Sequence, residues 1–196
     1  MDYEALERVL GHTFQDKALL ETALTHTSFA NEARHGTKHN ERLEFLGDSV
    51  LSIVVAEYLF THSSLPEGDL TRMRASLVCE AALFTFAQKI GLGRWLRLGH
   101  GEEMGGGPTR PSVVSDAFEA VIAALYLDGG IDAARAFILP FVTSDLTKQS
   151  AEEDYKTKLQ EVVQQNPSER LRYVVASQTG PDHDKHFVVE VHLNSN

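Results

Sequence analysis

The sequence has 196 residues, 42% of them hydrophobic, and a formal net charge of −10 at pH 7. This length suits one medium domain with a small appendage, and the hydrophobic share is sufficient for a folded core. The charge argues against a simple basic nucleic-acid binder, because phosphates repel an acidic surface. The single cysteine, Cys79, excludes an internal disulfide and is expected to be a buried thiol in its apolar run.

The sequence shows the pattern of neither a secretory signal nor a membrane-spanning helix. The first residues lack a basic region followed by an apolar one, and the longest apolar stretch, near 49–56, is far too short to span a membrane. We therefore expect a soluble, cytoplasmic protein with no membrane partner.

Residues 2–150 have the pattern of an all-α domain. Helices are expected near 2–11, over 16–24, from Asn40 through 60, over 69–90, over 112–128 and over 132–148. The segment 99–111 is rich in glycine and proline and predicts a flexible loop. The pair Gly129-Gly130 ends one helix, and Pro140 predicts a kink or break in the next.

After residue 148 the pattern changes. Residues 149–154 are polar and predict a short linker, and 155–165 predict one more helix. Two β-rich runs follow, 171–177 and 186–193, joined by a turn-rich stretch. A piece of about 42 residues is near the lower limit for independent folding, and its last strand leaves an unpaired edge. We infer that the sequence ends inside a second, α-β-β domain.

Two of the expected helices carry carboxylates on one face. Glu41, Glu44 and Asp48 are spaced i, i+3 and i+7, which places them within roughly 60° of one another around the helix axis. The helix beginning near Ser112 is almost entirely apolar, and its only two charged residues, Asp116 and Glu119, share a face. We expect this second helix to lie in the core.

Burying two uncompensated carboxylates costs several kcal/mol, so a cation is expected nearby. A hard divalent ion such as Mg²⁺ prefers oxygen ligands and can orient a water against a phosphodiester. Without metal, the like charges should raise one another's pKa values. The alternative is a pair of core helices whose carboxylates form salt bridges with Arg42 or Arg72, and the spacing leaves both interpretations open.

Other residues have simpler interpretations. His26 lies in an apolar segment and is expected to be a hydrogen-bonded structural residue rather than a metal ligand. His35 and His39 flank a Gly-Thr turn and are expected to be solvated. Trp95 is expected to be a buried aromatic.

The carboxylate helix resembles a known family. Residues 41–49, which read ERLEFLGDS, are similar to the signature stretch of ribonuclease III. Further similar segments are LTHTSF at 24–29, PEGDLT at 66–71, DAFEA at 116–120 and YLDGG at 126–130. The resemblance covers residues 3–148. Residues 155–161 and 180–185 resemble the first part of a double-stranded RNA-binding domain.

The resemblance implies an all-α endonuclease domain over 1–148, a linker over 149–154 and a partial α+β (α-β-β) double-stranded RNA-binding domain over 155–196. It implies hydrolysis of double-stranded RNA with Mg²⁺, for which Mn²⁺ can substitute, leaving 5′-phosphate and 3′-hydroxyl ends. Ribosomal and messenger RNA precursors are the expected substrates.

The resemblance also assigns roles to individual residues. Glu44, Asp48, Asp116 and Glu119 would bind the metal, with Asp48 and Glu119 as the main catalytic residues. Glu41 and Glu67 would line the cleft. Phe45 would insert into a socket on the partner in a homodimer, which places two sites along one cleft and predicts short 3′ overhangs. The expected RNA-binding residues, which would contact minor grooves, are Thr157, Gln160, Glu161 and His183.

Two other functions fit parts of the sequence. One is a non-catalytic helical dimer that binds structured RNA or a ribosomal partner; such a protein is expected to lack one or more of the four carboxylates, and all four are present. The other is a purely structural helical protein, which the negative charge would suit.

Overall fold

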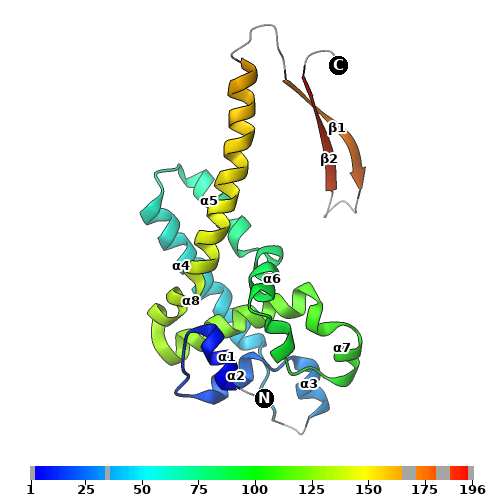
Figure 1. The fold of residues 1–196 in the computed structure, drawn as a ribbon. Helices are drawn as coiled ribbons and strands as arrows, with labels where there is room; N and C mark the ends of the chain where they lie inside the picture. Colours follow the sequence, from blue (N-terminus) through cyan, green and yellow to red (C-terminus); the bar gives the residue numbers. More distant parts are fainter. Residues whose placement is uncertain (1–2, 34–35, 165–170, 180–185, 194–196) are drawn as a thin grey trace. The chain divides into compact units, whose positions relative to one another are not determined.

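The computed structural model describes residues 3–33, 36–164, 171–179 and 186–193, and divides into two compact units, Met1–Asp145 and Leu146–Asn196. It is mostly helical, with a two-stranded antiparallel sheet at the C-terminal end, which confirms the expected fold class (Figure 1). The elements in chain order are α1 (Tyr3–Leu10), α2 (Lys17–Ala23), α3 (Thr27–Glu32), α4 (Glu41–His62), α5 (Glu67–Val78), α6 (Glu80–Lys89), η1 (Leu92–Trp95), α7 (His100–Met104), η2 (Gly107–Thr109), α8 (Pro111–Gln164), β1 (Leu171–Thr179) and β2 (His186–Leu193).

The first part of α8 is the central element of the helical unit. Every residue from Ala120 to Leu125 is fully buried, as the apolar pattern predicts. Phe118 from this segment packs against Phe86 of α6 and against Phe137 and Phe141 further along α8, with ring centroids 5.3–6.2 Å apart. Aromatic contacts at this spacing are favourable beyond the area that they bury. The central segment is therefore held on several sides.

A single glycine interrupts α8. Gly130 has φ 75° and ψ −174°, non-helical angles that mark a kink between two helices, as the Gly129-Gly130 pair predicts. No break occurs at Pro140, because α8 continues through it with helical backbone angles. The hydroxyl of Thr143 donates to the carbonyls of Leu139 and Pro140. The helix also runs through residues 149–154, so the expected linker is helical, and the position of the domain boundary stays a prediction.

The prediction of a single helix over 69–90 is wrong, because the structure has two helices there, α5 and α6. Cys79 joins them with an extended backbone, φ −76° and ψ 157°. This conformation turns Cys79 outward, so the prediction of a buried thiol is also wrong. Its Sγ lies 3.3 Å from the carbonyl of Ser76. The local pattern cannot show this break, because both halves have helical periodicity.

The glycine-rich segment 99–111 is also regular structure rather than a flexible loop, since it forms α7 and η2. Its glycines allow close packing. A Cβ on Gly99 would lie 2.8 Å from the carbonyl oxygen of Ser28, and a Cβ on Gly107 would lie 2.8 Å from that of Glu102. Arg110 pairs with Glu102 and donates to the Gly105 carbonyl. Helix α3, which the sequence pattern does not predict, lies against α7 of this segment.

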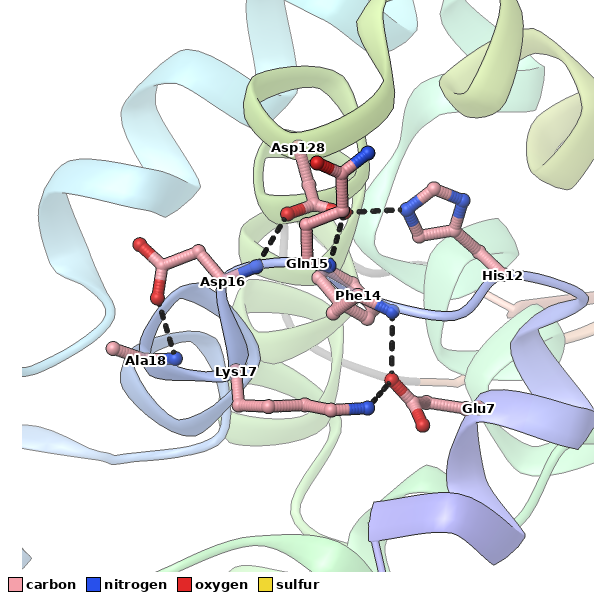
Figure 2. Close-up of polar contacts among 8 residues, drawn as sticks. All are labelled: Glu7, His12, Phe14, Gln15, Asp16, Lys17, Ala18 and Asp128. Carbon is pink, nitrogen blue, oxygen red and sulfur yellow. Dashed lines mark hydrogen bonds and ion pairs between the residues drawn. The ribbon is translucent and has the colours of Figure 1, made fainter.

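Two buried carboxylates fasten the segment between α1 and α2 (Figure 2). Asp128, 2% exposed, accepts hydrogen bonds from the amides of Gln15 (3.0 Å) and Asp16 (2.8 Å) and lies 2.8 Å from Nε2 of His12. Glu7 accepts from the amide of Phe14 at 2.7 Å and pairs with Lys17. Burial raises the pKa of Asp128, but its hydrogen-bond donors more than offset this, and the net pKa is lowered.

The C-terminal unit contains a β-hairpin in which Tyr173 pairs with Val191 and Val175 with Val189. A bulge follows Val175. Both strands lie where the β-rich runs predict them. Among the described residues, no helix is long and apolar enough to cross a membrane.

Candidate metal centre

Helices α4 and α8 touch at the backbone. A Cβ built on Gly47 of α4 would lie 1.9 Å from the carbonyl oxygen of Glu119 and 2.5 Å from its carbonyl carbon. Only glycine allows two helices to approach this closely. Glu44 and Asp48 lie three residues before and one residue after Gly47, so the contact brings their side chains to the part of α8 that carries Asp116 and Glu119.

Three of the four expected ligands meet in this place. Each of Glu44, Asp116 and Glu119 offers a carboxylate oxygen within 4.8 Å of those of the other two, and all three side chains are half-buried. Asp48 is exposed and lies outside this group of three. It is nevertheless close, because its charge raises the pKa of both Glu44 and Glu119. We call Glu44, Asp116 and Glu119 the carboxylate triad.

The pKa values of the triad are all raised. Burial, followed by the charges of Asp48, Asp116 and Glu44, raises the pKa of Glu119 to about 8. Burial and the charge of Asp116 raise that of Glu44. Burial also raises the pKa of Asp116, with the charge of Glu80 acting in the same direction. The carboxyl groups of the triad therefore ionise less readily than carboxyl groups in water do.

The contrast with Asp128 shows what the triad lacks. Asp128 is buried but satisfied by three donors, and its pKa is lowered. Within the described part of the chain, no side chain of the triad accepts a hydrogen bond or forms an ion pair. The salt-bridge alternative is wrong, because Arg72 pairs with Asp69 and no ion pair joins Arg42 to the triad in the described residues.

A divalent cation fits this arrangement. Three hard oxygen donors converge, no ion pair among the described residues neutralises them, and the site is partly open to solvent, which suits an ion that keeps water ligands. The four carboxylates lie on one face each of two helices, as their spacing predicts. The spacing does not show that Asp48 is exposed and lies outside the group formed by the other three.

Two neighbours of the triad were not expected there. Glu80, the first residue of α6, is near enough for its charge to raise the pKa of Asp116, and His26 is near enough for its charge to lower it. No sequence signal places either residue, since each is more than 30 residues from Asp116. His26 is hydrogen-bonded, as expected: its Nδ1 lies 2.8 Å from the hydroxyl of Ser28.

The remaining candidate residues lie outside the triad. Glu41 is exposed, 3.7 Å from His39, and its charge raises the pKa of Glu44. Glu67 begins α5, is exposed, and accepts a hydrogen bond from Thr71. Phe45 on α4 is 79% exposed.

The expected RNA-contacting residues are only partly covered by the structure. Thr157, Gln160 and Glu161 lie on α8, but their side chains are outside the described part, and His183 lies outside the described residues altogether. His35, which was expected to be solvated, also lies outside the described residues. Trp95, expected to be buried, is half-buried next to Arg94.

Comparison with known proteins identifies the family to which this fold belongs. Residues 16–146 match the family model described as ribonuclease-III-like, and residues 155–196 match that of the double-stranded RNA binding motif. The chain is 47% identical to Ribonuclease 3 of Caldanaerobacter subterraneus subsp. tengcongensis over 192 residues, 96% of this chain and 84% of that one. It is 46% identical to Ribonuclease 3 of Oceanobacillus iheyensis over 195 residues, 97% of this chain and 86% of that one.

Solved structures agree. The nuclease domain of ribonuclease III from Campylobacter jejuni is similar with a TM-score of 0.67 at 42% identity, over 73% of this chain and 97% of that one. Dicer from Pichia stipitis is similar with a TM-score of 0.51 at 28% identity, over 93% of this chain and 82% of that one.

The helical unit with its acidic group is thus a ribonuclease-III-like nuclease domain, followed in the chain by a double-stranded RNA binding motif. The chain belongs to the ribonuclease III family. It is an endoribonuclease, a phosphodiester hydrolase, and its substrate class is double-stranded RNA. The family is metal-dependent, and the carboxylate triad is an acidic cluster that could bind a metal.

Proposed function

We propose that this enzyme uses Mg²⁺ to hydrolyse both strands of an RNA duplex, leaving 5′-phosphate and 3′-hydroxyl ends with short 3′ overhangs. The observation that carries the proposal is the carboxylate triad, whose oxygens converge within 4.8 Å and form no ion pair in the described residues. Mn²⁺, which accepts the same oxygen donors, is expected to substitute for Mg²⁺.

Glu44, Asp116 and Glu119 would hold the ion, with Asp48 beside Glu119. When bound, Mg²⁺ supplies a water of lowered pKa and neutralises charge on the phosphodiester. Asp48 is exposed, so its carboxylate is free to accept a hydrogen bond from the attacking water and orient it. Water oxygen bonds to phosphorus, the bond to the 3′ oxygen breaks, and that oxygen takes up a proton. The exposed carboxylates of Glu41 and Glu67 would line the cleft and assist substrate or product handling.

We propose further that the enzyme acts as a homodimer through α4. Phe45 is 79% exposed, an unfavourable position for an aromatic ring in a monomer. An open groove of about 510 Å³ lies beside the same helix; Leu19, Leu43, Leu46 and Leu127 are among its lining residues, together with polar side chains such as Lys38 and Arg42. The Phe45 ring of a second copy would fit such a groove. A solved relative from Campylobacter jejuni is described as having structural flexibility in a region involved in dimer formation.

The C-terminal motif would hold the duplex by shape. Thr157, Gln160, Glu161 and His183 are proposed to contact two successive minor grooves, where 2′-hydroxyls distinguish RNA from DNA. Processing of ribosomal and messenger RNA precursors in the cytoplasm is the proposed cellular role, with domain bounds of 1–148 and 155–196.

A long uniform RNA duplex incubated with Mg²⁺ tests the proposal. Cleavage should require Mg²⁺ or Mn²⁺, stop in excess chelator, and give 5′ ends that a 5′-phosphate-dependent exonuclease degrades. Glu119→Gln should lower the rate by at least about 100-fold, the scale of losing a charge-stabilising group. Glu57→Gln, which removes a carboxylate of α4 that pairs with Arg135, is the matched control and should cleave normally. Cleavage in chelator, or an active Glu119→Gln variant, would exclude the proposed site.

A further inference from the structure

Asn40, at the N-cap of α4, is an exception among the buried polar side chains. In the described part of the chain the buried polar or charged residues are Glu7, Thr25, Asn40 and Ser115. Glu7 accepts a hydrogen bond from a backbone amide, and the hydroxyls of Thr25 and Ser115 donate to backbone carbonyls. The carboxamide of Asn40, which is 3% exposed, has no hydrogen-bond partner among the described residues. Buried polar groups are nearly always paired, so an unpaired one requires an explanation.

Helix capping does not explain this asparagine. An N-cap side chain normally accepts a hydrogen bond from one of the first amides of its helix, as Asp16 does at α2 by accepting from the Ala18 amide at 2.9 Å. The Asn40 side chain makes no such bond, and its φ of −78° and ψ of −18° are already helical. Its position is fixed instead through the backbone, because its amide donates to the Thr25 carbonyl at 2.9 Å. The side chain is therefore not used to end the helix.

Helical geometry places Asn40 on the face of α4 that meets α8. Because its backbone angles are helical, Asn40 continues the spiral of the helix toward the N-terminus. At about 100° per residue it lies about 20° around the axis from Gly47, whose added Cβ would touch the backbone of Glu119. It also lies about 20° from Leu51, which is 1% exposed. Asn40 is therefore on the same side of α4 as the contact that forms the metal centre.

Glu44 of the triad lies one helical turn after Asn40. The Glu44 amide donates to the Asn40 carbonyl at 2.8 Å, which is the regular bond between residues four apart in a helix. Side chains at this spacing have Cβ atoms about 5–6 Å apart, close enough for a carboxamide to donate to a carboxylate. Within the described residues, the Glu44 carboxylate accepts no hydrogen bond and the Asn40 carboxamide donates none. A donor and an acceptor without other partners are therefore within reach of each other on one helix.

We propose that Asn40 is a positioning residue of the metal centre, whose side-chain N–H donates to the Glu44 carboxylate and holds it in the orientation that binds the cation. Carboxylates that bind metals are usually hydrogen-bonded themselves, and that bond sets their direction. A neutral amide suits this role because it donates without adding a positive charge that would compete with the ion. The inference rests on the proposed function of the triad and adds to it a residue that contacts neither the ion nor the RNA.

Substitutions can separate the donor from the packing of this side chain. Asn40→Leu keeps a branched side chain but removes the donor, and Asn40→Ala removes the donor without adding volume. Thr25→Val is the matched control, since it also replaces a buried polar side chain by an apolar one of similar shape, at the residue that anchors the Asn40 backbone. Glu44→Ala, alone and combined with Asn40→Leu, tests whether the two side chains act together. Glu119→Gln reports on the triad itself.

The full chain is stripped of metal, and Mn²⁺ binding is measured by the electron paramagnetic resonance signal of free Mn²⁺, together with thermal unfolding and duplex cleavage. Asn40→Leu should weaken Mn²⁺ binding about 10- to 100-fold, the usual cost of losing an outer partner of a metal ligand. Its Tm in chelator should not fall, because an unpaired polar group is replaced by an apolar one. Thr25→Val should bind Mn²⁺ like wild type. In the Glu44→Ala background Asn40→Leu should cause no further loss of affinity, because the acceptor is gone. Excess Mn²⁺ should restore cleavage by Asn40→Leu, with KM for the duplex unchanged.

Each other result counts against the inference. If Asn40→Leu binds Mn²⁺ like wild type, or if it weakens binding as much in the Glu44→Ala background as in wild type, Asn40 does not act through Glu44 and the proposal is overturned. Asn40→Ala gives the same comparison if the leucine variant does not fold. If wild type and Glu119→Gln bind Mn²⁺ equally, the triad itself is not the metal centre, and the proposed function fails first.

Discussion

Glu119→Gln should make the metal-free protein more stable at alkaline pH. In the folded chain the pKa of Glu119 is about 8, against an ordinary value of 4.5. The native state therefore binds this proton more tightly than the unfolded state does. Stability is greatest when Glu119 is protonated, and it is lost as pH rises from about 4.5 through about 8. A neutral glutamine, similar in shape, avoids that loss.

The size of the effect follows from the pKa difference. Each tenfold change in an acid dissociation constant corresponds to about 1.4 kcal/mol, so a pKa of 8 instead of 4.5 would cost about 5 kcal/mol if fully realised. Glu119 is only half-buried, and solvent screens its charge. We therefore expect the variant to exceed wild type by about 2 kcal/mol at pH 8.5, which is about 4–8 °C in Tm for a chain of this size, and by less than about 0.5 kcal/mol at pH 5.

The assay is thermal unfolding followed by circular dichroism in chelator, at intervals from pH 5 to 9, for wild type, Glu119→Gln and Glu57→Gln. Adding Mn²⁺ at pH 8 should raise the Tm of wild type and of Glu57→Gln but not of Glu119→Gln, because only the intact triad gains from binding. If the three Tm profiles run parallel across the pH range, folding does not raise the pKa of Glu119. The electrostatic account of the site is then refuted.

Three further substitutions test the parts of the fold that support the site. Gly47→Ala would place a methyl group against the backbone of Glu119. We expect the free energy of unfolding in urea to fall by about 1–3 kcal/mol and the cleavage rate to fall about 100-fold. Wild-type stability and cleavage would mean that α4 and α8 are not in backbone contact. Asp128→Ala leaves the amides of Gln15 and Asp16 without their acceptor and should lower the free energy of unfolding by about 3 kcal/mol. Measured at a temperature well below the lowered Tm, kcat should not change. A lower kcat there would show that this carboxylate contributes to the site. Phe45→Ala should convert a dimer to monomers in sedimentation experiments while leaving Mn²⁺ binding intact; a monomeric wild type would contradict the proposed interface.

Local sequence was sufficient to predict the two carboxylate faces. The spacing of Glu44 and Asp48, and of Asp116 and Glu119, places each pair on one side of a helix, since helical geometry repeats every 3.6 residues. The apolar character of residues around Glu119 predicts a buried helix, and this is confirmed. The β-hairpin and the helix end at Gly130 follow from local signals of the same kind.

Other local predictions were wrong where packing, not periodicity, decided the outcome. Cys79 is exposed in a break between two helices, although its neighbours are apolar. The glycines of residues 99–111 allow close contact between segments, although the same composition in isolation is typical of a flexible loop.

What the sequence alone determined is that this chain has two helices with acidic faces, one of them too apolar to remain at the surface. Only the tertiary structure decided that these faces meet at Gly47, and that Glu44, Asp116 and Glu119 converge while Asp48 lies exposed outside their group. The reason is physical: the direction of a side chain on its own helix is set by a few neighbouring residues, whereas the distance between two helices depends on the shape and volume of every residue packed between them.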